Sequence, residues 1–220
     1  MRELTIQIYV HAVFGYEPHS PLHSLCILWS LCFLSNNVVG KTPYVFYTPF
    51  LRHIWTWLGL TPATKTNFIS LLGADYSCII VPGVVQETFL VERHSEVAFI
   101  KSRKGFVRIA MEMGFPLVPV FCFGQTNVYK WCKSGGKLYL QFSSAIKFTP
   151  VFFWGIFGSP LPFQHPMHVA VGRPSEFKKT SKPTMEEVNK VHGKFVEVFR
   201  DLFKRRKAQV GHADLELKIL

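Results

Sequence analysis

His19 is the first residue in the sequence whose type and position could do chemistry. Val13–Tyr16 is typical of the end of a short buried strand, and Gly15 allows another part of the chain to approach the backbone closely. Pro18 stops the strand and forces a corner, so His19 is expected at a strand end, where α/β proteins place working residues. A neutral imidazole can take a proton from a hydroxyl and return it later. A purely structural histidine is the alternative.

Two further groups of residues could act with this histidine. Glu87 lies in the loop Pro82–Glu87, which follows the apolar strand predicted over Tyr76–Val81. The segment Lys101–Phe106 places cations at a predicted helix start, where phosphates bind readily, although a solvated basic face would look the same. Together the three groups suggest a group-transfer site with a histidine base, a carboxylate that orients it and a cationic ledge for an anionic donor.

Composition favours a membrane surface or a polyphosphate ligand as the partner. The 220 residues carry a net charge of +11, yet 48% are hydrophobic and 15% aromatic. A typical nucleic-acid-binding protein would instead carry its basic residues on a polar surface. No C-x-x-C pair occurs, so we interpret the five cysteines as buried thiols rather than disulfides or a zinc site. These are Cys26, Cys32, Cys78, Cys122 and Cys132.

The elements that position these groups predict an α/β fold with a mostly parallel sheet flanked by helices. A helix is expected from Thr61, as N-cap, to Leu72, with Gly73 ending it. An amphipathic helix over Phe99–Gly114 follows, and then a buried strand over Leu117–Gly124. The succession of strand, loop, helix and strand indicates the class.

The C-terminal part contains the clearest helix signal. Thr184 and Glu187 form a capping box, and the helix is expected to end at the cations 204–207. Its apolar stripe is Val188, Val191, Phe195, Phe199 and Leu202. Short strands are predicted over Lys137–Phe142, after a Gly135–Gly136 turn, and over His168–Val171.

Two aromatic segments are candidates for membrane contact. Tyr44–Leu60 mixes aromatic residues with Arg52 and His53, and Phe148–Phe163 is apolar but broken by prolines. Aromatic residues beside a few cations are typical of membrane-interface elements, and an aromatic core is the alternative. We expect attachment near Trp55 and Phe152–Phe157. The apolar run Leu25–Leu34 is too short to cross a bilayer, and the N-terminus shows no secretory signal pattern.

Several motifs resemble those of the type 2 diacylglycerol acyltransferase family, particularly its plant members. The most specific run is Arg103–Ala110, which continues through Val118–Gln125. Shorter matches are Tyr16–Ser20, Tyr47–Phe50, Pro82-Gly83 with Gln86-Glu87, Gly155–Gly158 and His165–His168. The similarity covers most of the chain. On this resemblance, residues 1–220 are expected to form a single acyltransferase domain. Its core would span 11–210, and segment 21–44 would be divergent.

The resemblance implies a lipid-metabolic enzyme of triacylglycerol biosynthesis. Such an enzyme moves a fatty acyl group from acyl-CoA to diacylglycerol, with acyl-CoA as donor substrate and no permanently bound cofactor. The implied fold is that of the glycerolipid acyltransferases, and the implied location is the endoplasmic reticulum membrane, with the active domain on the cytosolic side, or else the lipid droplet. No nucleic-acid partner is implied, and a homo-oligomer is left open.

By the same resemblance, His19 matches the family's general base. Glu87 is the candidate that orients it, because Ser24 stands where the wider superfamily has an aspartate. Candidates for the CoA phosphates or anionic lipid headgroups are Arg103, Lys104 and Arg108, and Gly83 would let the backbone approach the substrate. Val84 replaces a family glycine, and the chain is expected to be N-terminally truncated, without the family's hydrophobic hairpin.

Three alternatives remain at this point. The same chemistry could act on monoacylglycerol or on a wax or isoprenoid alcohol, since pocket shape decides the acceptor. The chain could be an inactive truncated paralogue, or a basic module that binds nucleic acid or an anionic surface. A metal site at His165 and His168, or at His23, is not expected, because no third ligand accompanies them.

Overall fold

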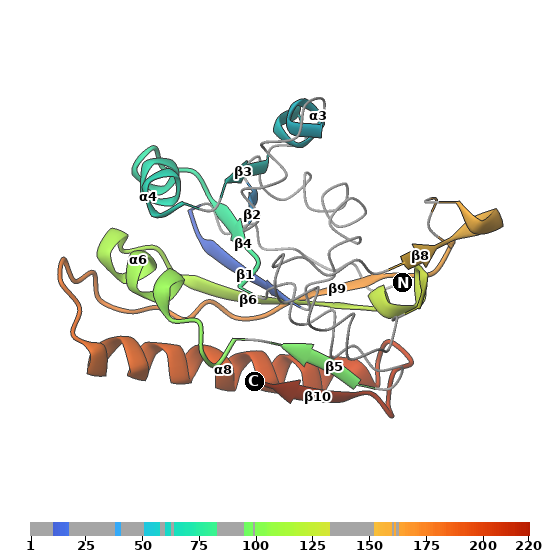
Figure 1. Cartoon of the computed structure of the whole chain (residues 1–220). Helices are drawn as coiled ribbons and strands as arrows, with labels where there is room; N and C mark the ends of the chain where they lie inside the picture. Colours follow the sequence, from blue (N-terminus) through green and yellow to red (C-terminus); the bar gives the residue numbers. More distant parts are fainter. Residues whose placement is uncertain are drawn as a thin grey trace, which may run out of the picture.

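The central sheet is formed by strands that are mostly parallel. The computed structural model describes residues 11–17, 38–40, 51–57, 60–62, 64–82, 95–98, 100–132, 152–159, 161 and 163–220. The sheet has six strands in the order β3-β2-β4-β1-β6-β9, and only β9 runs antiparallel to its neighbour (Figure 1). Their bounds are β1 Val13–Glu17, β2 Val38–Gly40, β3 Leu60–Pro62, β4 Cys78–Ile80, β6 Leu117–Phe123 and β9 His168–Val171. The predicted class is confirmed as α/β with a mixed sheet.

β1 lies in the middle of this sheet, with β4 on one side and β6 on the other. Gly15 is opposite Ile80 in β4 and Pro119 in β6, so the carboxyl ends of the three strands meet at one edge. Every residue of β6 is buried, as expected for a continuous apolar strand covered on both faces. The predicted strands at Val13–Tyr16 and His168–Val171 are thereby confirmed, the first extended by Glu17.

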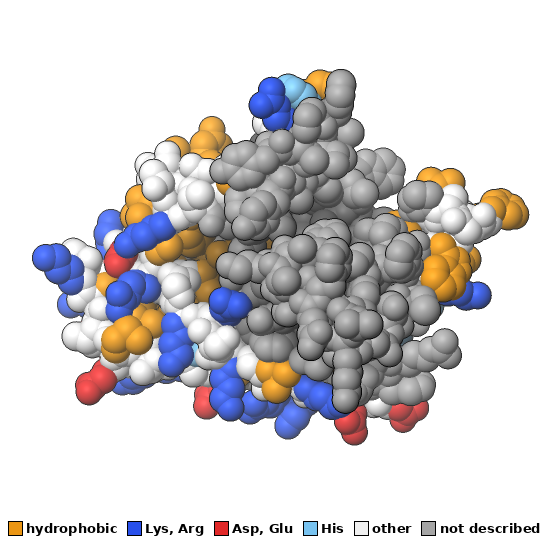
Figure 2. Space-filling model, viewed as in Figure 1, with side chains coloured by type: hydrophobic (Ala, Val, Ile, Leu, Met, Phe, Trp, Pro, Cys, Tyr) orange, Lys and Arg blue, Asp and Glu red, His pale blue; other side chains and the backbone are white. Residues whose placement is uncertain are grey.

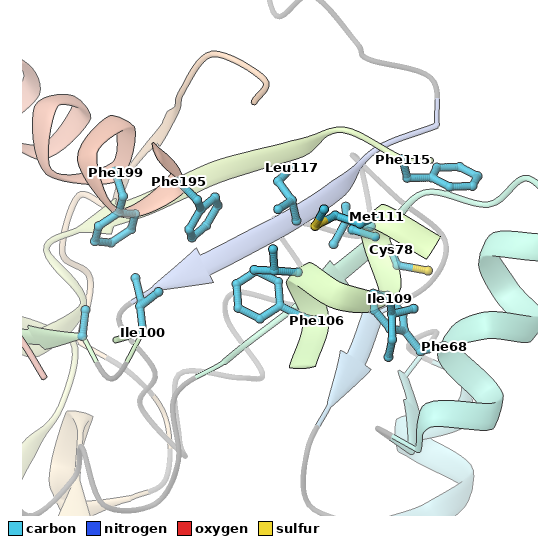
Figure 3. Packing of buried hydrophobic residues seen from close by; sticks show 14 of the residues in the cluster. Phe68, Cys78, Ile100, Phe106, Ile109, Met111, Phe115, Leu117, Phe195 and Phe199 are labelled. Atoms are coloured by element: carbon cyan, nitrogen blue, oxygen red, sulfur yellow. The ribbon is translucent and has the colours of Figure 1, made fainter. Parts of the chain in front are cut away.

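Three helices pack on one face of the sheet. They are α4 Lys65–Gly73, α6 Gly105–Met113 and α8 Met185–Lys207, and Figure 1 shows α8 running along the sheet with α6 beside it. The α8 stripe contributes Phe195 and Phe199 to an aromatic core that also contains Phe106 and Leu117 (Figure 3). The capping box at Thr184 is present as predicted.

Gly15 of β1 is packed closely against α8. A Cβ built on Gly15 would lie 2.6 Å from Cζ of Phe195, closer than real Cβ contacts. The expected close approach to the backbone at Gly15 is confirmed, and the approaching group is the Phe195 ring. Residues on the other face of the sheet, including Tyr16, Val118 and Cys122, form a second and smaller apolar cluster.

Two small sheets flank the main one. β5 Ser95–Ala98 pairs in parallel with β10 Glu216–Ile219, and β7 Lys130–Cys132 pairs antiparallel with β8 Phe152–Trp154. Neither pairing was predicted. The remaining elements are α3 Leu51–Trp57 and two 3₁₀ turns, η1 Gln125–Asn127 and η2 Ile156–Gly158.

The helix after β3 begins three residues later than predicted. Thr61 is not its N-cap, because Thr61 and Pro62 belong to β3 and pair with β2. The N-cap is Thr64, whose side-chain oxygen accepts a hydrogen bond from the Asn67 N–H at 3.1 Å. Gly73 is the last helical residue, and Ala74 is the C-cap.

The helix predicted over Phe99–Gly114 is also shorter than expected. α6 begins at Gly105, because the backbone before it is held elsewhere: the Lys101 N–H donates to the Leu220 carbonyl, and the Arg103 N–H to the Ile100 carbonyl. At its other end Gly114 has a φ of +83°, and the helix stops there as predicted. Arg103 and Lys104 therefore lie in the turn that enters the helix.

Other predictions concern residues that the structure does not describe. The Lys137–Phe142 strand, the Gly135–Gly136 turn, the Leu25–Leu34 run and most of segment 21–44 lie outside the described residues. Cys78 and Cys122 are free buried thiols, as predicted. Among the described helices, none combines the length and the apolar character needed to span a bilayer.

Candidate functional site

The candidate site lies at the edge of the sheet where β1 and β4 end. The predicted catalytic residues His19 and Glu87, and also Gly83, lie outside the described residues. The structure does describe the positions that precede them in the chain. His19 is the second residue after Glu17, the end of β1, and Gly83 directly follows Pro82, two residues beyond β4.

A cleft of about 350 Å³ opens beside the end of β4, between the starts of α4 and α6. Its apolar lining includes Phe68 of α4 and Ile80 of β4 with Phe106 and Ile109 of α6. Its polar lining includes Thr64, Lys65, Ser102, Arg103 and Lys104. A cleft lined by both apolar and cationic side chains can hold a ligand that carries both an acyl chain and phosphates.

The cations of this cleft are available to an anion. Within the described part of the chain, none of Lys65, Arg103 and Lys104 forms an ion pair with a carboxylate. The Nε atom of Arg103 is buried and has no hydrogen-bond acceptor among the described residues. α6 begins directly after Lys104, whose side chain does not cap the helix, and the N–H groups at a helix start contribute a partial positive charge. The arrangement favours a phosphate.

Arg108 is not part of this cleft. It lies one turn further along α6, and its Nη2 donates to Sδ of Met185 at 2.9 Å. The structure thus brings together two of the three predicted phosphate-binding cations, Arg103 and Lys104, and adds Lys65. Sequence reasoning missed Lys65, although its place directly after the N-cap of a helix was a usable signal.

His192 supports the turn that carries these cations. This buried residue of α8 donates from Nε2 to the Ile100 carbonyl at 3.0 Å. Burial lowers the pKa of His192 from its usual 6.5, nearby Lys104 lowers it further, and the hydrogen bond to Ile100 acts in the opposite direction. A neutral imidazole at this position adds no positive charge beneath the cationic turn.

A buried polar pair joins the ends of β1 and β6. Gln125, the second residue after β6, donates from Nε2 to the hydroxyl of Tyr16, and both side chains are buried. Gly124 makes the corner with a φ of +88°, and a Cβ there would lie 2.6 Å from the Pro166 carbonyl oxygen. Sequence reasoning missed this pair, because Tyr16 and Gln125 are 109 positions apart.

The described thiols and the Tyr16 phenol are unsuited to nucleophilic attack. Burial raises the pKa of Cys78 to about 12 and also raises the pKa of Cys122. Burial, with a further contribution from Cys122, raises the pKa of Tyr16 well above its usual value. These groups therefore stay protonated at neutral pH and leave base chemistry to another residue.

The fold and the cleft define the class: an α/β domain with a cleft, lined by apolar and cationic side chains, at the carboxyl edge of its parallel strands. Residues 4–219 match the family model described as diacylglycerol acyltransferase. The chain therefore belongs to the diacylglycerol acyltransferase family.

Curated relatives carry related names. The chain is 33% identical to diacylglycerol O-acyltransferase 1 of Eremothecium gossypii, over 94% of this chain and 50% of the relative. It is 28% identical to human diacylglycerol O-acyltransferase 2, over 93% of this chain and 59% of the relative. It is 30% identical to human acyl-CoA wax alcohol acyltransferase 2, over 82% and 60%. The chain thus spans about half to three fifths of these relatives. No solved structure matches it.

Proposed function

We propose that this protein is an acyl-CoA-dependent O-acyltransferase that converts diacylglycerol to triacylglycerol. One observation carries the proposal: a chain that matches the family over residues 4–219 has a cleft lined by apolar side chains and by cations that form no ion pair with any described carboxylate. Acyl-CoA combines a fatty chain with several phosphates, so it suits both kinds of lining residue. Arg103, Lys104 and Lys65 bind the phosphates in this scheme, and Arg108 has no contact with the donor.

His19 is the general base of the proposed reaction, and Glu87 orients it. The imidazole takes the proton of the acceptor hydroxyl, whose oxygen attacks the thioester carbonyl. The new C–O ester bond forms as the C–S bond breaks, and the imidazolium returns the proton to the CoA thiolate. Gly83 lets the backbone approach the reacting group. The position of His19, two residues after the end of β1, supports this role.

The proposal extends to the fold family and to the location. A central sheet with α4, α6 and α8 on one face is compatible with the glycerolipid acyltransferases, and we assign the domain to them. Because both the acceptor and the product are lipids, we place the enzyme at the cytosolic side of the endoplasmic reticulum membrane, or on lipid droplets. The wax alcohol acyltransferase among the relatives supports a long-chain alcohol as second candidate acceptor.

The test is lipid synthesis in microsomes from cells that lack their own acyltransferases. The native chain should form labelled triacylglycerol from labelled acyl-CoA, and His19→Ala should form none. Parallel reactions with monoacylglycerol and with a long-chain alcohol identify the preferred acceptor. Protein that is present in the membrane fraction but forms no ester with any acceptor would disprove the proposed activity.

Arg103 and Arg108 form a matched pair for the donor site. Arg103→Ala should raise the acyl-CoA concentration for half-maximal rate roughly tenfold or more, because a charge-assisted hydrogen bond is lost. Arg108→Ala removes the same charge from the same helix region but outside the cleft. The acyl-CoA concentration that gives the half-maximal rate should therefore stay close to that of the native chain. Equal effects of the two substitutions would contradict the proposed donor site.

A further inference from the structure

The turn around η2 is the most exposed apolar element in the part of the chain that the structure describes. It follows β8, projects from the body of the molecule in Figure 1, and forms the protruding hydrophobic group at the same end in Figure 2. The exposed fractions of Phe157, Leu161 and Trp154 are 102%, 63% and 36%. Full exposure of a phenylalanine is unfavourable in water and needs a reason.

The backbone holds this phenylalanine outward. Phe157 has a φ of +56° and a ψ of 28°, the left-handed conformation that glycine and asparagine adopt but aromatic residues rarely do. A strained residue persists only where its surroundings over-determine it. The exposed ring is therefore built into the turn and is not a side effect of a loose segment.

The turn also satisfies its own backbone donors. Acceptors within the turn receive the N–H groups of Gly155, Ile156, Gly158, Ser159 and Leu161, at 2.8–3.3 Å. The sequence adds Pro160 and Pro162, which have no N–H to satisfy. A segment that enters an apolar medium must pair its polar groups internally, because no water is available there. The η2 turn meets much of this requirement.

The surroundings of the turn suit a surface of lipid headgroups. Lys130, exposed on the neighbouring strand β7, has its Nζ 5.7 Å from the centre of the Phe163 ring, at the return of the turn. The sequence contains no aspartate or glutamate between Glu112 and Glu176. An apolar tip beside a lysine, in a stretch of sequence without acidic residues, matches the boundary between acyl chains and phosphate headgroups.

We propose that the η2 turn, through Phe157 and Leu161 with Trp154 at its base, inserts into the interfacial layer of a lipid bilayer. A protein partner would need a contact area of about 800 Å² on each side, and a single narrow turn cannot supply that. The choice of lipid rests on the proposed function, in which both the acceptor and the product are lipids. Within the second aromatic segment predicted from the sequence, 148–163, the inference assigns membrane contact to one turn and three side chains.

The turn is connected to the carboxyl end of β6. β7 follows β6 through η1, directly after the Gly124–Gln125 corner, and the Phe163 N–H donates to the Val128 carbonyl at 2.8 Å. The turn thus leaves the sheet from the edge where β1 and β6 end. Insertion of the turn brings this edge close to the membrane, where a diacylglycerol would arrive.

The test is flotation of the purified full-length chain with phosphatidylcholine vesicles, alone and with added phosphatidylserine, at low and high salt. The native chain should float with both kinds of vesicle. The double substitution Phe157→Asn and Leu161→Asn should lower the partition coefficient roughly tenfold or more, because two apolar side chains no longer leave water. Asparagine adds no charge and accepts the φ of position 157, so misfolding and repulsion are avoided.

Met185→Asn is the matched control. Met185 is 54% exposed at the other end of the molecule, at the start of α8, and its replacement should leave flotation unchanged. Absence of flotation of the native chain, native-like flotation of the double variant, or an equal loss in the control would each overturn the proposal. The proposal would also be overturned if sedimentation showed that the double variant self-associates less than the native chain while it still floats with vesicles. That result would mean that the turn contacts a second copy of the chain. The vesicles contain no substrate, so these results are independent of the acyl-transfer assay.

Discussion

The two most aromatic regions of the described structure have opposite environments. On the helical face of the sheet, the rings of Phe195 and Phe199 are buried against β1 and β6 (Figure 3). At the η2 turn, Phe157 is fully exposed in a strained conformation. Both regions are rich in phenylalanine, so composition alone does not separate core from surface. The spacing of the residues separates them. The apolar stripe of α8 repeats with the helical period, whereas the apolar residues of 148–163 follow no regular spacing.

The largest expected effect tests this contrast directly. Phe195→Ala should lower the free energy of unfolding by about 3–5 kcal/mol, because it leaves a cavity between α8 and the sheet. Phe157→Ala should change it by less than about 0.5 kcal/mol, because the ring contacts mostly solvent. Urea unfolding followed by tryptophan fluorescence measures both. Similar losses would mean that the η2 turn is packed against the domain.

The second prediction concerns the closest contact on the buried side. Gly15→Ala places a methyl group 2.6 Å from Cζ of Phe195, and the overpacking should cost about 1–3 kcal/mol. Gly193→Ala is the matched control, because Gly193 lies on α8 with no atom within 4 Å of the added Cβ. There alanine should stabilise the helix by about 1 kcal/mol. Thermal unfolding of the two variants should therefore shift in opposite directions, and shifts of the same sign would contradict the packing.

Much of the scaffold could be predicted from local signals. β6 is a continuous apolar run, and α8 combines a capping box at Thr184 with a stripe of helical period. The N-cap of α4 was misplaced because Thr61-Pro62 and Thr64 are both good helix starts. The choice between them is made by pairing of β3 with β2, a non-local contact that no local pattern reveals.

The candidate site could be predicted only in part, for the same reason. The cations Arg103 and Lys104 were identified correctly as neighbours of a helix start. Their turn, however, is held by the Leu220 carbonyl and by His192, from the distant C-terminal part of the chain. The β5–β10 pairing that brings Leu220 there joins segments far apart in sequence. The Tyr16–Gln125 pair was missed because it too depends on tertiary contacts.

The third prediction uses the buried histidine on the aromatic face of α8. The folded protein has a lowered pKa at His192, whereas the unfolded chain keeps about 6.5. Between these two values the unfolded state binds a proton that the folded state does not, so stability falls as the pH drops below about 6.5. His192→Gln keeps a donor for the Ile100 carbonyl and does not titrate. Unfolding midpoints should therefore fall more steeply in the native chain than in the variant between neutral and mildly acidic pH. Parallel curves would contradict a lowered pKa at His192.

The smallest effect on the free energy of unfolding is expected at the exposed residue, Phe157, and here the substitution should stabilise the protein. Phe157→Asn should be more stable than Phe157→Ala by about 1 kcal/mol, because asparagine tolerates the left-handed conformation that position 157 requires. Both substitutions remove the same exposed ring, so their difference isolates the backbone strain. Urea unfolding in the absence of lipid gives the two free energies. A gain in stability combined with weaker vesicle binding would show that the native residue is kept for lipid contact and not for folding. If alanine and asparagine were equally stable, the turn would not impose this conformation, and the exposed ring would lose its structural explanation.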